Sequence, residues 1–308
     1  MTDTVRTQAL TRRFGDATAL DQLTLSVEEG EIFGLVGPDG AGKTTTMRLL
    51  TGILEPSSGE AWVDGLSVLT DAEPIKDRIG YMAQRFGLYP DLTVLENIAF
   101  YAELYEVPRA GRDERVERLL AFSNLTPFKR RQAGNLSGGM KQKLGLACAL
   151  IHTPRVLFLD EPTNGVDPVS RRDFWRILYQ LQQEGVTIFV STAYLDEAER
   201  CNRIGLLHQG RLLACDTVEG VKGLLKGSLL ELRCDQPRRA SILLRTAALG
   251  TVALFGDRIH ILVEDADRGR TAIETVLRAE GIPCHELRVI EPTLEDVFTS
   301  AIPEVVHA

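Results

Sequence analysis

The sequence predicts an α/β protein: a layered domain with a parallel sheet, followed by a smaller α+β domain. Over the first two thirds of the chain, short apolar runs typical of buried parallel strands alternate with segments of helical character. After about Gly220, strand-like and helix-like segments follow in the order β-α-β-β-α-β, which is a ferredoxin-like arrangement. A composition of 44% hydrophobic and 25% charged residues is typical of folded proteins and excludes a disordered or low-complexity chain.

The elements of the first part follow from the spacing of its apolar residues. Short, nearly unbroken apolar runs predict three buried strands, and the longer segments between them predict five helices. The strands are EIFGLVG at 31–37, RVLFLD at 155–160 and TIFVST at 187–192. The helices cover residues 43–54, 94–105, 112–124, 139–151 and 170–184. This alternation predicts an α/β layered domain built on a parallel sheet.

The elements of the second part are predicted in the same way. In chain order they are a strand at 229–235, a helix at 237–249, a hairpin of TVALFG and RIHILVE, a helix at 268–280 and a strand at 284–290. The hairpin turns at Gly256 and Asp257, a pair that suits a tight turn. We expect the two domains to cover residues 1–220 and 228–308.

Charge, cysteine content and hydropathy narrow the classes of function. The formal net charge of −8 disfavours a broad surface for nucleic acid or anionic lipid. The five cysteines are odd in number and contain no CxxC pair, so they suggest neither a disulfide framework nor a zinc site. Apolar runs such as 144–151 are too short to cross a bilayer, and the first ten residues contain no apolar segment. We therefore expect a cytosolic protein that reaches a membrane only through a partner.

A phosphate-binding loop is predicted between the first apolar strand and the first helix. The sequence GPDGAGKTT fits the pattern G-x-x-x-x-G-K-[ST]. Its residues are Gly37, Pro38, Asp39, Gly40, Ala41, Gly42, Lys43, Thr44 and Thr45. Glycines allow the backbone to wrap around phosphate oxygens, and the amides at the helix N-terminus point their partial positive charge at the anion. Lys43 would then neutralise the β and γ phosphates of ATP, and the Thr44 hydroxyl would bind Mg²⁺.

Two carboxylates follow the second apolar strand. Asp160 and Glu161 come directly after Val156, Leu157, Phe158 and Leu159. They therefore lie at the carboxyl edge of the sheet, where α/β proteins bind ligands. Asp160 is placed to hold Mg²⁺ through water, and Glu161 to orient or deprotonate an attacking water. A strand that ends in acidic residues is common, and the phosphate-binding loop is what makes the catalytic interpretation favoured.

A third set of residues resembles the ABC ATPases. The sequence LSGGMKQ, with Leu136, Ser137, Gly138 and Gly139, is similar to their signature sequence. Gln84 resembles the glutamine of their Q-loop, and EPTNGVDP at 161–168 resembles their D-loop. The resemblance implies that the signature faces the phosphate loop of a second subunit, so that two such domains enclose two nucleotides. It also implies that Gln84 contributes to the Mg²⁺ site and to catalysis.

The resemblance extends to the ATP-binding subunits of bacterial ABC-2 type exporters, the drug-resistance group. It rests on QRFGLYPDLTVLENI, LSGGMKQKLGLACAL, YLDEAERC and EPTLEDVF, and it covers almost the whole chain. It implies an ATPase on the inner face of the cell membrane whose partners are ABC-2 type transmembrane subunits and a second ATP-binding subunit. It further implies that Phe14 stacks on adenine and that residues 85–97 contact the membrane subunit; Phe14 could equally be a packing residue at a strand end.

Two positions depart from the pattern of that family. Asp39 stands where the family usually has Asn, and we expect its carboxylate to turn away from phosphate. Ala193 stands where the family has its switch histidine, and none of the five histidines replaces it. Two interpretations stay open: this subunit provides one slow site of an asymmetric pair, or it forms a slow homodimer whose water is held by Gln84 and Glu161 alone.

Other functions were weighed against the exporter subunit. A soluble ABC protein that acts as a mechanical or regulatory module usually joins two ATPase domains or carries a long coiled coil, and this chain shows neither. A GTPase or small-molecule kinase would leave the Ser137 signature unexplained. The second domain carries no cluster of catalytic or ligating residue types, so packing or dimer contact is favoured there over a regulatory ligand site.

Overall fold

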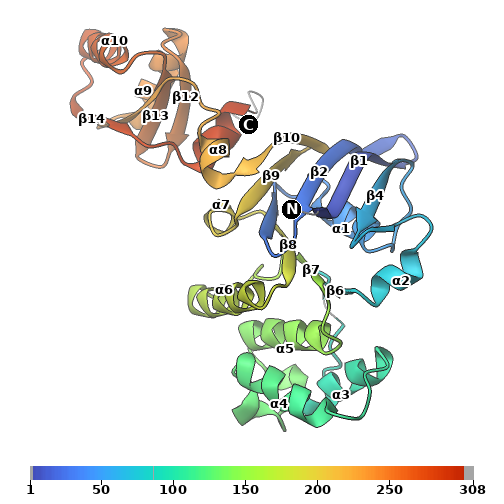
Figure 1. Cartoon of the computed structure of the whole chain (residues 1–308). Coiled ribbons are helices and arrows are strands. Elements are labelled where there is room, and N and C mark those ends of the chain that lie inside the picture. The colour runs from blue at the N-terminus through green and yellow to red at the C-terminus, as the bar shows by residue number, and fades with distance from the viewer. Residues whose placement is uncertain (1–2, 86, 302–308) are drawn as a thin grey trace. The chain divides into compact units, whose positions relative to one another are not determined.

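The computed structural model describes residues 3–85 and 87–301, which divide into two compact units between Cys215 and Asp216 (Figure 1). Each unit has its own buried apolar clusters. The division groups a short helix, α8 (Val218–Lys222), with the second unit, because α8 packs against α11 (Leu294–Ala301). The domain limits expected from the sequence, 1–220 and 228–308, stay a prediction.

A six-stranded sheet forms the centre of the first unit, with strand order β10-β9-β3-β8-β7-β6. Its strands are β3 (Ile32–Val36), β6 (Ile79–Met82), β7 (Val156–Asp160), β8 (Thr187–Thr192), β9 (Arg203–His208) and β10 (Arg211–Thr217). β3 pairs in parallel with β8 and β9, and β7 pairs in parallel with β6 and β8. β3, β7 and β8 are buried along their whole length, as continuous apolar runs predict. The carboxyl ends of these three strands therefore meet at one edge.

A second sheet of four strands covers part of this unit, and the sequence did not predict it. It consists of β1 (Asp3–Phe14), β2 (Ala17–Glu28), β4 (Ser58–Val63) and β5 (Leu66–Ser67), in the order β2-β1-β4-β5. The register between β1 and β2 shifts repeatedly, and Ala9 and Gln22 have left-handed backbone conformations. These bulges break the alternation of apolar and polar residues by which such strands are recognised.

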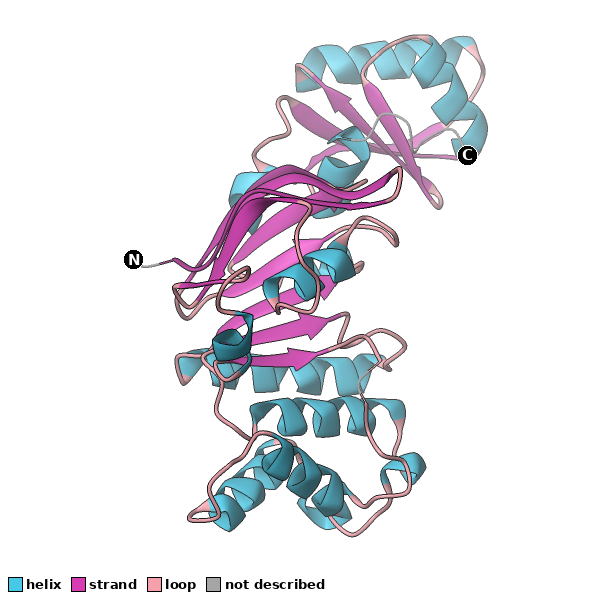
Figure 2. Ribbon diagram, turned by 90° about the vertical axis from the view of Figure 1, so that its right-hand side faces the viewer, coloured by secondary structure: helices cyan, strands magenta, loops and turns pink. Residues whose placement is uncertain are grey.

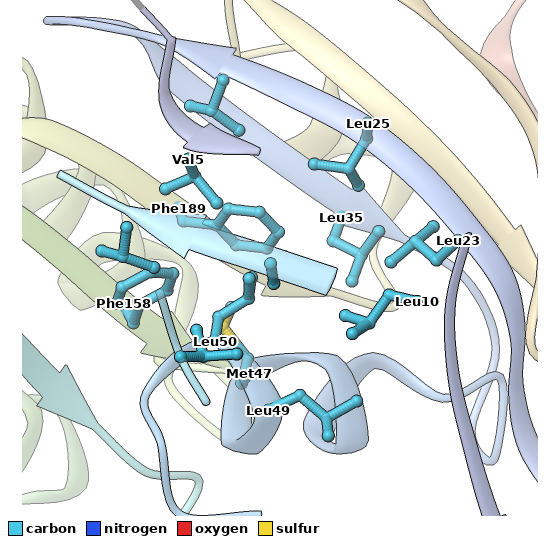
Figure 3. Packing of buried hydrophobic residues seen from close by; sticks show 14 of the residues in the cluster. Val5, Leu10, Leu23, Leu25, Leu35, Met47, Leu49, Leu50, Phe158 and Phe189 are labelled. Atoms are coloured by element: carbon cyan, nitrogen blue, oxygen red, sulfur yellow. The ribbon is translucent and has the colours of Figure 1, made fainter. Parts of the chain in front are cut away.

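The first helix, α1 (Lys43–Leu50), contacts β2 and β4 of one sheet and β7 and β8 of the other. Its Met47, Leu49 and Leu50 point into the same cluster as Phe158 and Phe189 of the central sheet (Figure 3). Leu10 and Leu23 of the antiparallel sheet pack on the other side of this cluster. A helix between two sheets is thus fixed by apolar packing on both sides, and its N-terminus is held at the carboxyl end of β3.

Three helices form a separate apolar cluster of the first unit (Figure 1). They are α3 (Val94–Leu104), α4 (Arg112–Phe122) and α5 (Gly138–Leu150). The remaining helical elements are α2 (Ala72–Lys76), η1 (Thr126–Phe128), η2 (Ala133–Asn135), α6 (Pro168–Gln183) and α7 (Leu195–Ala198). The five helices expected from the sequence are present, with ends shifted by a few residues.

Local capping explains where these helices begin and end. The prediction that the first helix reaches residue 54 was wrong, because α1 ends at Leu50 and Gly52 has a left-handed φ of 69°. α6 begins two residues earlier than expected because Asp167 caps it. The Asp167 Oδ1 accepts hydrogen bonds from the Val169 and Ser170 amides at 3.1 and 3.0 Å.

The second unit has the predicted β-α-β-β-α-β order. Its elements are β11 (Ser228–Cys234), α9 (Pro237–Thr246), β12 (Thr251–Phe255), β13 (Arg258–Val263), α10 (Ala266–Ala279) and β14 (Cys284–Ile290). The strand order β12-β13-β11-β14 is antiparallel throughout and ferredoxin-like (Figure 2). The sequence missed α11, where Leu294 and Val297 are buried and the Asp296 carboxylate lies 2.6 Å from His260 of β13.

Membrane-spanning elements were sought in the same structure. Within residues 3–85 and 87–301, no helix combines the length and the apolar character that a bilayer crossing requires.

Residues 1–217, cut after β10, should fold without the second unit, because both apolar clusters of the first unit consist of residues before this point. We expect a cooperative thermal unfolding transition, measured by circular dichroism, with the secondary structure of an α/β domain. A fragment that ends at Asn202 is the control. It lacks β9, which pairs with β3 and carries the buried Leu206 and Leu207, and should not fold. A fragment 1–217 that unfolds without cooperativity would contradict the division.

Candidate functional site

The loop between β3 and α1 is held close to its neighbours at two glycines. A Cβ on Gly37 would lie 2.2 Å from the Leu207 carbonyl oxygen, and a Cβ on Gly42 would lie 2.6 Å from that of Ala19. Gly42 also has a φ of 108°, which side chains disfavour, and it directly precedes α1. These two positions therefore require glycine for steric reasons, and they hold the loop against β2 and β9.

The loop and the start of α1 surround a cavity of about 320 Å³. Its lining residues are Ala19, Asp39, Gly40, Ala41, Gly42, Lys43, Thr44, Thr45, Gln84 and Glu161. α1 begins without a side-chain cap, so its first backbone amides can serve an anion in the cavity. Most of the residues of the predicted phosphate loop thus line one hollow together with Gln84 and Glu161.

Lys43 is almost fully buried, with 3% of its surface exposed. Its ammonium nitrogen donates hydrogen bonds to the carbonyl oxygens of Gly37 at 2.8 Å and Pro38 at 3.0 Å. The third partner is the carboxylate of Glu161, whose Oε1 lies 3.0 Å away. An ammonium group has three protons, so all three are used in this structure. A phosphate that binds Lys43 has to compete with Glu161.

Asp160 ends β7 in the buried interior, with 1% of its surface exposed. Its Oδ1 accepts a hydrogen bond from the Ser191 hydroxyl at 2.7 Å. Its Oδ2 is buried and has no hydrogen-bond partner among the described residues. A buried carboxylate oxygen without a donor is unfavourable unless a cation or ordered water satisfies it.

Glu161 is held at its backbone and at both carboxylate oxygens. Its amide donates to the Ser191 hydroxyl at 3.0 Å, and its φ of 48° is left-handed. The Oε2 atom accepts hydrogen bonds from the side-chain amides of Gln84 at 2.9 Å and Asn164 at 3.3 Å. Ser191 thus binds both strand-end acids, and a non-glycine residue in a sparsely populated conformation points the carboxylate of Glu161 into the cavity.

Ala193 lies beside a second cavity, of about 220 Å³. This cavity is lined by Asp39, Glu161, Thr163, Asn164, Thr192, Ala193 and Tyr194. The methyl group of Ala193 offers no hydrogen bond to a molecule in this space. Asp39 is exposed and borders both cavities.

The predicted signature residues lie apart from the phosphate loop. Ser137 caps the N-terminus of α5, where its hydroxyl accepts a hydrogen bond from the Met140 amide at 3.3 Å. A Cβ on Gly139 would lie 2.5 Å from the Ser170 side chain, whereas Gly138 faces open space and Leu136 is buried. None of the four lines the cavity around Lys43 in the described part of the chain.

Phe14 also lies outside that cavity. It ends β1, and 47% of its surface is exposed. The Arg12 guanidinium carbon lies 4.6 Å from the centre of its ring. The ring is therefore accessible on the surface and is not a core residue, which leaves its predicted adenine contact open.

Sequence reasoning missed the residues that join the loop after β7 to the loop after β8. Glu197 is completely buried and accepts hydrogen bonds from the hydroxyl groups of Thr163 at 2.5 Å and Thr192 at 3.0 Å. The Arg171 Nε lies 3.2 Å from its Oε1. The hydroxyl residues Ser191 and Thr192 at the end of an apolar strand were the available indication, because they stand at the same edge as Asp160 and Glu161.

This fold and this cavity define the chain as a P-loop nucleotide-binding domain of the ABC type. The description "ABC transporter" belongs to the family model that matches residues 20–164. The chain belongs to the family of ABC transporter ATP-binding proteins, and the resemblance and fold class inferred from the sequence are confirmed.

The relatives in this family are resistance proteins. The chain is 40% identical over 304 residues to the Probable multidrug ABC transporter ATP-binding protein YbhF of Escherichia coli K12, with 97% of this chain and 52% of that protein covered. It thus spans about half the length of this relative. It is 36% identical over 300 residues to the Daunorubicin resistance ATP-binding protein DrrA2 of Streptomyces coeruleorubidus, with 96% of this chain and 93% of that protein covered.

Solved structures agree with the fold of the first unit. One described as an ATP binding subunit of an ABC transporter has a TM-score of 0.65 at 28% identity, and it covers 72% of this chain and 92% of that chain. A dimeric ATP-binding cassette in a post-hydrolysis state, bound to ADP and Pi, has a TM-score of 0.63 at 27% identity, covering 69% and 98%. The ATP-binding domain is thus the part of the chain with structural counterparts.

Glu161→Gln should tighten the binding of ADP about fivefold. The substitution removes the ion pair that occupies Lys43 and the repulsion between Glu161 and phosphate, and replacing a charge-assisted hydrogen bond by a neutral one is a difference of about 1 kcal/mol. Isothermal titration with ADP checks this, because ADP excludes any effect of hydrolysis.

Two further variants control that titration. Glu73→Gln removes the same charge from an exposed position and should leave ADP affinity unchanged. Lys43→Ala should weaken ADP binding strongly, and adding Glu161→Gln to it should have a smaller effect than in the wild type. Equal or weaker ADP binding by Glu161→Gln alone would contradict the competition between Glu161 and phosphate.

Proposed function

We propose that this chain is the ATP-hydrolysing subunit of a bacterial ABC-2 type exporter that drives transport through partner membrane subunits. The observation that carries the proposal is the convergence of Lys43 and Glu161 on one cavity, with Asp160 directly beside it. The names of the relatives, which refer to multidrug and daunorubicin resistance, support export of drug-like molecules. No observation favours the alternative of a soluble regulatory ATPase.

ATP would bind with its phosphates in the cavity of about 320 Å³. The backbone amides of the loop and of the first turn of α1 would contact the phosphate oxygens, and Lys43 would exchange Glu161 for the β and γ phosphates. The exposed ring of Phe14 would stack on adenine. Asp39, which is exposed at the rim, has room to turn its carboxylate toward solvent.

The residues around the cavity fit a Mg²⁺ ion. The buried Oδ2 of Asp160, which lacks a hydrogen-bond partner in the described residues, is a suitable oxygen ligand, directly or through water. The Thr44 hydroxyl and the Gln84 side chain line the same hollow and would complete the protein's share of the ligands. When bound, the ion would neutralise charge on the transferred phosphate.

Hydrolysis would use Glu161 as the base. When Lys43 turns to phosphate, the Oε1 of Glu161 loses that partner and can accept a proton from the attacking water. The water oxygen then forms a bond to the γ phosphorus while the bond from that phosphorus to the bridging oxygen of ADP breaks. Gln84 and Asn164 hold Oε2 through this change.

Two copies of the domain, or this domain and a related one, would enclose the nucleotides. The start of α5 with Ser137, Gly138 and Gly139 lies away from the chain's own phosphate loop, and an open helix N-terminus suits the γ phosphate on a partner. Residues 87–97 and α3 present the exposed aromatic residues Tyr89 and Phe100, which suit a contact with a membrane subunit at the inner face of the cell membrane.

Glu161→Gln should keep ATP binding but stop hydrolysis, so that ATP traps a closed dimer. The carboxamide cannot accept the proton of the attacking water, whereas the phosphate contacts remain. Size-exclusion chromatography with Mg-ATP checks this, with ADP as the control that should leave the protein monomeric. Unchanged turnover together with a monomer in ATP would remove Glu161 from the proposed role.

Ala193→His should raise the rate of hydrolysis several fold. The family's histidine donates a hydrogen bond toward the γ phosphate, and the loss of one preorganised donor typically lowers turnover by about 10² to 10³ fold. Position 193 borders a cavity together with Glu161, so an imidazole has access to the reacting groups. Steady-state phosphate release by wild type and variant is the measurement. Brisk wild-type hydrolysis that the substitution leaves unchanged would show that position 193 does not limit the rate.

A further inference from the structure

The loop after β8 reaches Glu161 through Tyr194, although residue 193 supplies no polar group. The Tyr194 hydroxyl donates to the Oδ1 of Asn164 at 3.5 Å, and the Nδ2 of Asn164 donates to the Oε2 of Glu161 at 3.3 Å. We propose that Asn164, oriented by Tyr194, is a positioning residue that holds Glu161 for catalysis where the side chain of residue 193 contributes nothing. The inference rests on the proposed ATP hydrolysis.

The polarity of this chain of hydrogen bonds is consistent from end to end. A phenol donates its proton, an amide oxygen accepts it, and the amide nitrogen on the other side of the same group donates to a carboxylate. If the amide of Asn164 turned over, its oxygen would face the carboxylate of Glu161 without a proton between them. The hydroxyl of Tyr194 therefore selects the orientation of Asn164 that supports Glu161.

The division of labour between the two carboxylate oxygens matters for the chemistry. Oε1 of Glu161 is bound to Lys43, a partner that phosphate would take away. Oε2 is bound by two neutral amides, those of Gln84 and Asn164, which come from different loops. Two donors on Oε2 fix the plane of the carboxylate, so that Oε1 stays aimed into the cavity when Lys43 is engaged by phosphate.

A buried frame holds Asn164 and Tyr194 in register. Each follows closely after a threonine, Thr163 or Thr192, whose hydroxyl donates to the fully buried carboxylate of Glu197. The Arg171 guanidinium stacks 4.4 Å from the centre of the Tyr194 ring, and its Nε lies 3.2 Å from Glu197. The side chains of Asn164 and Tyr194 thus stand on two loops that one carboxylate ties together.

Asn164 borders the cavity beside Ala193 but not the cavity around Lys43. Its removal should therefore lower the rate of the chemical step without weakening nucleotide binding. We expect Asn164→Ala to reduce kcat for ATP hydrolysis between about 10 and 10² fold, a typical cost of misplacing a reacting group, with KM for ATP and affinity for ADP unchanged.

Tyr194→Phe isolates the orienting hydroxyl. It keeps the ring that stacks on Arg171 and removes only the donor to Asn164. We expect a smaller fall in kcat than for Asn164→Ala, and no further fall when the two substitutions are combined, because the hydroxyl acts through Asn164. The matched control is Tyr179→Phe, which removes a hydroxyl bound to the Arg200 carbonyl in α6 and should leave kcat unchanged.

A second cycle separates positioning from mere structural support. In an Ala193→His background the imidazole shares the task of holding the reacting groups, so Asn164→Ala should cost less than about threefold there. A structural role would give the same loss in both backgrounds, together with a lowered thermal unfolding temperature. That result, or a wild-type kcat in Asn164→Ala, overturns the inference.

The outcomes also distinguish this inference from the proposed function. If the wild type hydrolyses ATP and Glu161→Gln does not, the proposed function stands and the Asn164 variants decide the inference alone. If the wild type binds ATP but shows no hydrolysis above the Glu161→Gln background, with or without Ala193→His, both fail together.

Discussion

Lys43 and Glu161 form an ion pair of 3.0 Å in the buried interior, and the arrangement of the site depends on it. Two charges removed from water are costly unless hydrogen bonds satisfy their remaining groups. Here two carbonyl oxygens of the phosphate loop complete the ammonium, and the amides of Gln84 and Asn164 complete the carboxylate. The pair keeps the groups of two different loops in place before a nucleotide arrives, and phosphate can replace the carboxylate without leaving the cation unpaired.

The parallel sheet makes this pair possible. β3, which leads into the phosphate loop, and β7, which ends at Asp160, are both neighbours of β8. Ser191, near the end of β8, then binds Asp160 through its hydroxyl and accepts the amide of Glu161. A strand without a carboxylate of its own thereby sets the position of both acids, which gives the central strand a role that its apolar sequence does not reveal.

Position 193 separates nucleotide binding from chemistry in this chain. The groups that would contact phosphate, namely the loop amides, Lys43 and Thr44, are intact, whereas the loop after β8 has lost a polar side chain at one position. That loop is nevertheless tightly held, because Glu197 has no exposure and two hydroxyl donors. A buried, fully paired carboxylate retained beside a lost side chain indicates that the loop still has to keep its shape.

The sequence by itself determined the α/β class, the three buried strands, the ferredoxin-like order of the second unit and the residues that form the cavity around Lys43. These follow from local patterns: apolar runs, glycines before a helix, acids after a strand. Only the tertiary structure gave the antiparallel sheet, because bulges at Ala9 and Gln22 destroy its alternation. Only the structure paired Glu161 with Lys43, Gln84 and Asn164, and Glu197 with Thr163 and Thr192. Such contacts join residues from separate loops, and strand order, which no local pattern encodes, decides which loops meet.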